Sequence, residues 1–224
     1  MTTREFRVYD DVRGDELIGG ALRIERQVVP ESLRGLRGLI HPGDPRDVER
    51  FQRDTPMRDL LVEVGPGKGA FLCAMAARFP ERLAVGFEVR LAFCARTLRR
   101  AERAGLPNLR VVWGDARAAI PILLRPGSVR DAYLLYPDPW WKRGHAGRRY
   151  GSRLAGLLLD CLVPGGLVVL KSDVPAYLDE LVRVFRQAGP FEPCAPPPDL
   201  PPTDREAKLA RTGGKGFAAA LIKR

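Results

Sequence analysis

The sequence predicts an α/β fold in which a mostly parallel sheet is covered by helices on both faces. From about residue 58 onward, short apolar runs alternate with amphipathic stretches, which is the pattern of strands and covering helices. Glycines follow the first apolar run directly, and acidic residues lie at the ends of this run and the next two. With 224 residues, 45% of them hydrophobic, the chain can bury the core of one large domain.

The first half of this domain contains three expected strands. A buried strand at 60–64 is followed by a glycine loop and a helix at 70–79 that is apolar except for Arg78. The second strand is expected at 83–87, and an amphipathic helix follows it. The third strand is expected at 110–113.

The second half repeats the alternation. A fourth strand is expected at 131–136, and a helix through 154–162 ends at a Pro-Gly-Gly turn. The fifth strand is expected at 167–171, after which Asp173 can cap the next helix. A last strand is expected at 217–222.

Residues 1–57 differ from the rest of the chain. They are rich in Arg, Pro and Gly and show weak periodicity. We therefore expect an N-terminal arm over 1–57, partly flexible, and a single domain over 58–224.

The charge of the chain indicates a polyanionic partner. It has 37 basic and 27 acidic residues, a net charge of +10. Such an excess is typical of nucleic-acid binding. Only six basic residues are lysines, so an arginine bias of the whole proteome is an alternative explanation. A basic run with no acidic residue between Pro139 and Leu159 favours a real patch, made by Lys142, Arg143, Arg148, Arg149 and Arg153.

Metal and membrane binding are not indicated. The four cysteines are widely spaced without a C-x-x-C pair, so they are expected to be core residues rather than zinc ligands or disulfides. No stretch approaches 18 apolar residues, and the N-terminus has no apolar signal region. The expected location is the cytoplasm.

The glycine loop indicates an adenosine-containing cofactor. Gly65, Gly67 and Ala70 satisfy G-x-G-x-x-G/A, and Glu88 lies near the distance expected for a ribose-binding acid. This pattern alone fits a nicotinamide or flavin dinucleotide as well as S-adenosylmethionine. Glu63 favours S-adenosylmethionine, because its charge opposes a pyrophosphate but suits an ammonium and a sulfonium. Gly69 gives the G-x-G-x-G spacing that methyltransferases share, and Asp115 follows the third strand, where it can accept a hydrogen bond from adenine.

The segment Tyr136 to Arg143 places a carboxylate, two indoles and two cations where the fourth strand ends. Asp138 lies between two prolines, which hold its backbone extended. Ligands bind at strand ends of open α/β sheets, so the segment can be a ligand-binding loop. An ordinary proline-rich turn is the alternative interpretation.

Across about residues 58–224, the chain resembles the tRNA (guanine-N7)-methyltransferase family. The motifs that carry the resemblance are Glu63-Val64-Gly65-x-Gly67-x-Gly69, Gly86-Phe87-Glu88-Val89, Gly114-Asp115-Ala116, Pro137-Asp138-Pro139-Trp140, Lys171-Ser172-Asp173 and Thr203-x-x-Glu206. The chain departs from the family pattern at Trp141, where a proline is usual, and at Arg205, where an aromatic residue is usual.

The resemblance implies a Rossmann-like class I methyltransferase fold, with a seven-stranded, doubly wound sheet whose last strand is antiparallel. It implies S-adenosyl-L-methionine as cofactor, no metal, and a monomer or homodimer that forms 7-methylguanosine in the tRNA variable loop. The implied cofactor contacts are Glu63, Gly65, Gly67, Gly69, Glu88, Asp115, Ala116 and Asp138, with Asp138 also catalytic. The implied substrate contacts are Lys142, Asp173, Thr203 and Glu206, with Arg143, Arg148 and Arg149 on RNA phosphates.

Three other functions remain open from the sequence. A methyltransferase acting on another RNA, such as adenine N6 of rRNA, is disfavoured because its usual motif places both prolines after the acid. A nicotinamide-dependent oxidoreductase leaves the basic run unexplained. A non-catalytic RNA-binding module with a decayed cofactor site would have lost an acid at position 63, 88 or 115, and all three are present.

Overall fold

The computed structural model describes residues 29–30, 33, 36–138 and 151–224. Its strands are β1 (Leu39–Ile40), β2 (Leu60–Val64), β3 (Ala84–Glu88), β4 (Leu109–Trp113), β5 (Val129–Leu135), β6 (Leu162–Ser172), β7 (Phe191–Cys194) and β8 (Phe217–Lys223). Its helices are α3 (Pro45–Asp54), α4 (Ala70–Arg78), α5 (Leu91–Arg103), α6 (Ala116–Leu123), α7 (Ser152–Cys161), α8 (Pro175–Ala188) and α9 (Asp204–Thr212).

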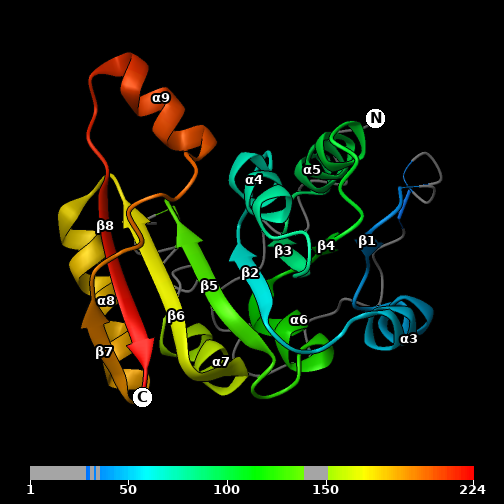
Figure 1. Cartoon of the computed structure of the whole chain (residues 1–224), viewed down its shortest axis with the longest axis horizontal. Helices are drawn as coiled ribbons and strands as arrows, with labels where there is room; N and C mark the ends of the chain where they lie inside the picture. The colour runs from blue at the N-terminus through cyan, green and yellow to red at the C-terminus, as the bar shows by residue number, and fades with distance from the viewer. Residues whose placement is uncertain (1–28, 31–32, 34–35, 139–150) are drawn as a thin grey trace.

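The described strands form one sheet in the order β1-β4-β3-β2-β5-β6-β8-β7 (Figure 1). The pairs from β1 to β6 are all parallel, whereas β8 is antiparallel to both β6 and β7. The order reverses between β2 and β5, because the chain first winds outward from β2 and then crosses to its other side. The expected doubly wound, mostly parallel sheet with an antiparallel last strand is confirmed.

Within the described residues the sheet has eight strands and not the seven expected. The additional strand is β1, which pairs in parallel with β4 and lies inside the region expected to be an arm. Asp44 then caps α3 by accepting a hydrogen bond from the backbone N–H of Arg46 at 3.0 Å. A two-residue strand carries no detectable alternation, so periodicity could not reveal it.

Two apolar layers enclose the sheet. On one face, α4 and α5 pack through residues such as Phe71, Leu72 and Leu98. On the other face, α6, α7 and α8 pack through residues such as Ile120 and Leu158. Cys73, Cys94 and Cys161 are buried, as expected for core cysteines. Among the described helices, none is long and apolar enough to cross a bilayer.

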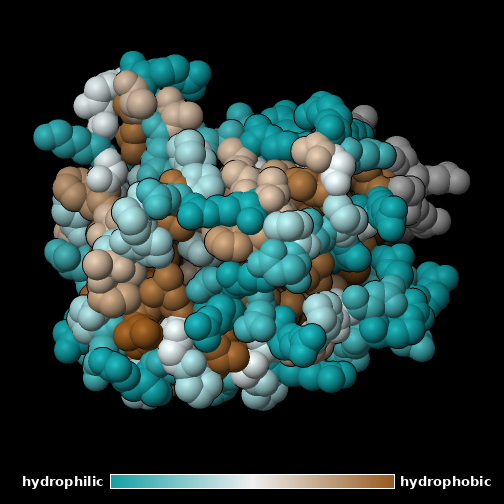
Figure 2. Space-filling model, viewed as in Figure 1, coloured by the Kyte–Doolittle hydropathy of each residue, from teal (hydrophilic) through white to brown (hydrophobic). Residues whose placement is uncertain are grey.

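The carboxyl ends of β2, β5 and β6 point toward the same edge of the sheet, and α9 lies beyond that edge (Figure 1). None of the residues of α9 is buried. In the space-filling view, α9 forms a separate projection above the body (Figure 2). Its position therefore depends on polar contacts, which are described below.

Candidate active site

The glycine loop between β2 and α4 has an unusual backbone. Gly65, Gly67 and Gly69 have φ of +75°, +56° and +77°, a region that side chains strongly disfavour. Thr97 of α5 holds the loop, because its Oγ1 donates a hydrogen bond to the carbonyl oxygen of Gly67 at 3.2 Å. Gly69 is the N-cap of α4, and because it has no side chain, it gives the first turn of α4 no side-chain cap.

Gly69→Ala is expected to be more destabilising than Gly67→Ala. A Cβ at position 69 would lie 2.4 Å from Cγ2 of Thr97, whereas a Cβ at position 67 would meet nothing within 4 Å. Both variants carry the backbone strain, about 1–2 kcal/mol, but only Gly69→Ala adds about 1–3 kcal/mol of overpacking. Urea unfolding of the two variants measures the difference. Equal losses would show that Thr97 does not constrain the loop.

Glu88, at the end of β3, is tied to the glycine loop. Its Oε2 accepts a hydrogen bond from the backbone N–H of Gly67 at 3.1 Å, and its Oε1 accepts one from Arg90 at 2.8 Å. Burial raises the pKa of Glu88, although these amides act in the opposite direction. The predicted ribose acid therefore lies against the predicted cofactor loop.

Glu63, near the end of β2, has an incomplete environment. Only 3% of its surface is exposed, and its Oε2 has no hydrogen-bond partner within the described part of the chain. Burial, assisted by the charges of Glu88 and Asp204, raises its pKa to about 8. A buried acceptor without a partner costs free energy, so it indicates a missing donor.

Asp115 makes a local contact and is not joined to Glu63 or Glu88 by any contact that the structure records. It is the N-cap of α6 and accepts hydrogen bonds from the backbone N–H of Arg117 at 2.8 Å and from its guanidinium at 2.6 Å. Ala116, the first residue of α6, is buried. Their contact with the cofactor stays a prediction.

The chain bends sharply before Asp138. Tyr136 has φ +54°, an uncommon value for a residue with a side chain, and such strain clusters at functional sites. The backbone N–H of Tyr136 donates to the carbonyl oxygen of Lys171 at 2.8 Å. Asp138 follows this bend at the carboxyl end of β5 and is exposed. The remainder of the segment, including Trp140, Lys142, Arg143, Arg148 and Arg149, lies outside the described residues.

Thr203 and Glu206 form a capping box at the start of α9. Oγ1 of Thr203 accepts from the backbone N–H of Glu206 at 3.0 Å, and Oε2 of Glu206 accepts from the N–H of Thr203 at 2.8 Å. The other carboxylate oxygen of Glu206 accepts from Nζ of Lys171 at 2.8 Å. The T-x-x-E motif therefore has a structural role in addition to its predicted contact with substrate.

Thr203→Ala is expected to loosen α9. Loss of an N-cap costs about 0.5–2 kcal/mol of helix stability, and α9 has no buried residue to compensate. Amide hydrogen exchange of residues 204–212 is expected to accelerate about 3- to 30-fold. Thr212→Ala at the opposite end is the matched control. Equal exchange in both variants would contradict the capping role.

Asp173 does not cap the helix that follows it, so that prediction is wrong. Ser172 takes the local contact instead, since its Oγ accepts from the N–H of Val174 at 3.0 Å. Asp173 forms an ion pair with Arg205 of α9. Arg205 departs from the family pattern, and its ion pair binds α9 to the loop that follows β6.

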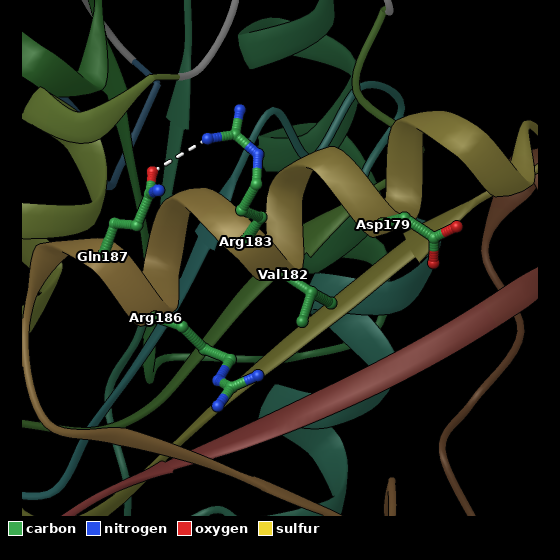
Figure 3. Close-up of a pocket in the computed structure, with 5 residues that line it drawn as sticks. All are labelled: Asp179, Val182, Arg183, Arg186 and Gln187. Atoms are coloured by element: carbon green, nitrogen blue, oxygen red, sulfur yellow. Dashed lines mark hydrogen bonds between the residues drawn. The ribbon is translucent and has the colours of Figure 1, made fainter.

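A shallow hollow lies elsewhere, along the exposed face of α8 (Figure 3). It is lined by Asp179, Val182, Arg183, Arg186 and Gln187, and Arg183 donates to Oε1 of Gln187 at 2.9 Å. All five residues come from one helix, and none was predicted for the site. Among the described residues, no cluster of three metal-ligating side chains is found.

Comparisons with known proteins agree on one family. A family model described as a putative methyltransferase matches residues 57–219. A tRNA (guanine-N(7)-)-methyltransferase of Anaeromyxobacter dehalogenans (strain 2CP-C) is 40% identical over 171 residues, which cover 73% of this chain and 85% of the relative. The protein of the same name from Myxococcus xanthus (strain DK1622) is 34% identical over 88% of this chain and 97% of the relative.

A solved structure supports the fold alone. The crystal structure of the 16S rRNA methyltransferase KamB aligns with a TM-score of 0.58 at 19% identity. The alignment covers 81% of this chain and 94% of that protein.

Proposed function

The chain belongs to the tRNA (guanine-N7)-methyltransferase family, and we propose from this that its strand-end site transfers a methyl group from S-adenosyl-L-methionine to N7 of a tRNA guanine. One observation carries the assignment of the site: the unpartnered Oε2 of Glu63, buried beside a glycine loop that Glu88 holds. A tRNA substrate is consistent with the net charge of +10 and with the expected cytoplasmic location.

The residues at the strand ends fit this cofactor better than a dinucleotide. Burial and the charges of Glu88 and Asp204 all raise the pKa of Glu63, so the site disfavours further negative charge. A pyrophosphate would increase the repulsion, whereas an ammonium and a sulfonium reduce it. We therefore assign the amino-acid portion of the cofactor to Glu63 and the glycine loop, and the ribose to Glu88.

The chemistry needs positioning and charge stabilisation more than a base. Guanine N7 has an in-plane lone pair and loses no proton on methylation. When bound, the cofactor supplies an activated methyl group on a sulfonium. Positive charge develops on the purine, and the carboxylate of Asp138 stabilises that charge more than it stabilises neutral guanine.

Carboxylates near α9 are suited to recognise the base. Guanine presents two adjacent donors, N1–H and the N2 amino group, which one carboxylate can accept together. Glu206 and Asp173 both lie near the ends of β5 and β6, but each already has a cationic partner, Lys171 and Arg205. We propose that guanine donates these two hydrogen bonds to one of them, and that Trp140 or Trp141 stacks on the base, a contact typically worth about 1–3 kcal/mol.

The binding of tRNA is expected to weaken steeply with salt. If Arg148 and Arg149 each neutralise one phosphate, Arg148→Ala/Arg149→Ala should reduce the slope of log K against log salt by about 1.4–1.8. The double variant Arg96→Ala/Arg99→Ala, on the exposed face of α5, is the charge-matched control. Filter binding between 50 and about 200 mM salt measures the slopes. Equal slopes in the two variants would remove the basic run from the RNA interface.

The position of methyl transfer can be tested with a modified substrate. Replacing guanosine by 7-deazaguanosine throughout a tRNA transcript keeps the Watson–Crick edge but puts C–H where N7 was. Methyl label from S-adenosylmethionine should enter the ordinary transcript and not the 7-deaza transcript. Equal labelling of both would show that another atom is methylated.

A thermal-shift comparison tests the cofactor by itself. S-adenosylhomocysteine should raise the Tm because it binds only the folded protein, and NAD should not. Stabilisation by NAD alone would favour the oxidoreductase alternative.

A further inference from the structure

Three consecutive residues of α9 contact three different parts of the site. Asp204 reaches the start of α4 and also Arg100 of α5, with Oδ1 3.7 Å from Nη2 of the arginine. Arg205 pairs with Asp173 after β6, and Glu206 pairs with Lys171 at the end of β6. The N-terminal end of α9 therefore joins the predicted cofactor loop to the predicted substrate residues.

The carboxylate of Asp204 lies at the N-terminus of α4, where a helix favours an anion. Its Oδ2 accepts from the backbone N–H of Ala70 at 3.4 Å, the first residue of the nine-residue helix α4. The helix N-terminus favours negative charge, and Gly69 supplies no side chain to cap it. Glu63 also faces this turn, because the amide of Leu72 forms a hydrogen bond with its carboxylate. A carboxylate from α9 thus lies where the cofactor loop begins its helix.

This arrangement leaves one group unsatisfied and another weakly held. Glu63 is buried with Oε2 unpartnered, and the charge of Asp204 disfavours its ionised form. Asp204 itself is 40% exposed, and both of its contacts are long. Exposed ion pairs of this kind contribute little to stability, so Asp204 can leave at low cost.

S-adenosylmethionine brings the two groups that this turn would accept. Its α-ammonium is a donor for the free oxygen of Glu63, and its α-carboxylate suits the amide of Ala70 and the guanidinium of Arg100. The carboxylate of the ligand and that of Asp204 cannot both occupy the amide of Ala70.

We propose that Asp204 holds the place of the α-carboxylate of the cofactor, so that cofactor binding displaces Asp204 and breaks the contact between α9 and the start of α4. This inference rests on the proposed cofactor site. Occupation of the cofactor loop is then coupled to one of the three contacts that hold the N-terminal end of α9.

The test is the affinity of ligands for Asp204→Asn, measured by titration calorimetry. Removing the competing charge should increase the affinity for S-adenosylhomocysteine about 3- to 10-fold. This range follows from the usual strength of a helix-terminus contact and an exposed ion pair. The affinity for 5′-methylthioadenosine should not change, because that ligand lacks the carboxylate and the ammonium. Asp179→Asn, which removes one exposed charge from α8, controls for net charge and should bind both ligands as the wild type does.

Arg100→Gln gives the opposite expectation. With Asp204 displaced, Arg100 pairs with the carboxylate of the ligand. This variant should therefore lower the affinity for S-adenosylhomocysteine and leave the affinity for 5′-methylthioadenosine unchanged. Asp204→Ser serves as a second variant that keeps a good residue for the first turn of a helix. Circular dichroism verifies that each variant is folded.

The outcomes separate the inference from the function on which it rests. If Asp204→Asn and Asp204→Ser bind S-adenosylhomocysteine as tightly as the wild type, or more weakly, Asp204 does not compete with the cofactor and the inference is wrong. Weaker binding would make Asp204 a ligand for the ammonium. If neither the wild type nor the variants bind S-adenosylhomocysteine, the proposed cofactor itself fails.

Discussion

Asp138→Ala is expected to lower kcat for tRNA methylation about 10²- to 10³-fold while leaving tRNA affinity unchanged. A carboxylate directed at developing positive charge acts mainly in the transition state, and removal of one such group typically costs this much. Asp138 follows the strained bend at Tyr136, and this bend fixes where its backbone leaves β5. Single-turnover kinetics with saturating tRNA measures the chemical step.

Asp138→Asn and Asp160→Ala complete this test. Asn keeps the size and hydrogen-bonding capacity but not the charge, so it should be nearly as slow as Ala. Asp160 is exposed on α7, and its substitution should leave the rate unchanged. If Asp138→Ala transfers methyl groups at the wild-type rate, the carboxylate is not part of the chemistry.

The free energy of unfolding of the wild type is expected to fall strongly as the pH rises from 5 to 8, and Glu63→Gln is expected to remove this fall. The folded-state pKa of Glu63 is raised to about 8 from an ordinary value of 4.5. Between these values the unfolded chain ionises while the folded protein keeps the proton, so unfolding releases a proton. The free energy of unfolding of the wild type should therefore fall with rising pH by up to about 1.4 kcal/mol per unit relative to Glu63→Gln.

Urea unfolding of both proteins at pH 5, 6.5 and 8 measures this difference. Below the unfolded pKa the wild type retains the full contribution, and the loss is complete once pH has passed the folded pKa. Glu81→Gln, at an exposed position before β3, should show the same pH dependence as the wild type. Parallel curves for Glu63→Gln and the wild type would mean that Glu63 is not held protonated.

The parts of the fold with strong local patterns were predictable from the sequence. The strand at 60–64 is predictable at its observed bounds, because a run that is apolar except for Glu63 is followed directly by the glycine loop. Strands β1 and β7 were not identified. The first is two residues long, and the second contains Pro193 and is only partly buried, so neither carries an alternating pattern.

Helix α9 was not predicted either, although its T-x-x-E motif is a helix-start signature. The family resemblance assigns this motif to a substrate contact, whereas its capping role follows from its residue types and spacing alone.

In the candidate site, too, residues placed by a local pattern were predictable, whereas contacts between distant parts of the chain were not. The placement of Glu63 and Glu88 close to the same edge of the sheet was predictable, because each lies near the end of a buried strand and parallel strands end at one edge. Their contact with the cofactor stays a prediction. The contacts of Asp204 and Arg205 were not, because they join residues 134 and 32 positions apart in the chain. The departure from the family at Arg205 gave a signal, and its pairing with Asp173 required the structure.

The methylated nucleoside that the protein forms on tRNA reports its activity most directly. Purified protein is incubated with S-adenosylmethionine and bulk tRNA from cells that lack the enzyme, and the nucleosides are analysed by mass spectrometry. We expect new 7-methylguanosine that depends on Asp138. The appearance of another methylated nucleoside, without 7-methylguanosine, would contradict this expectation.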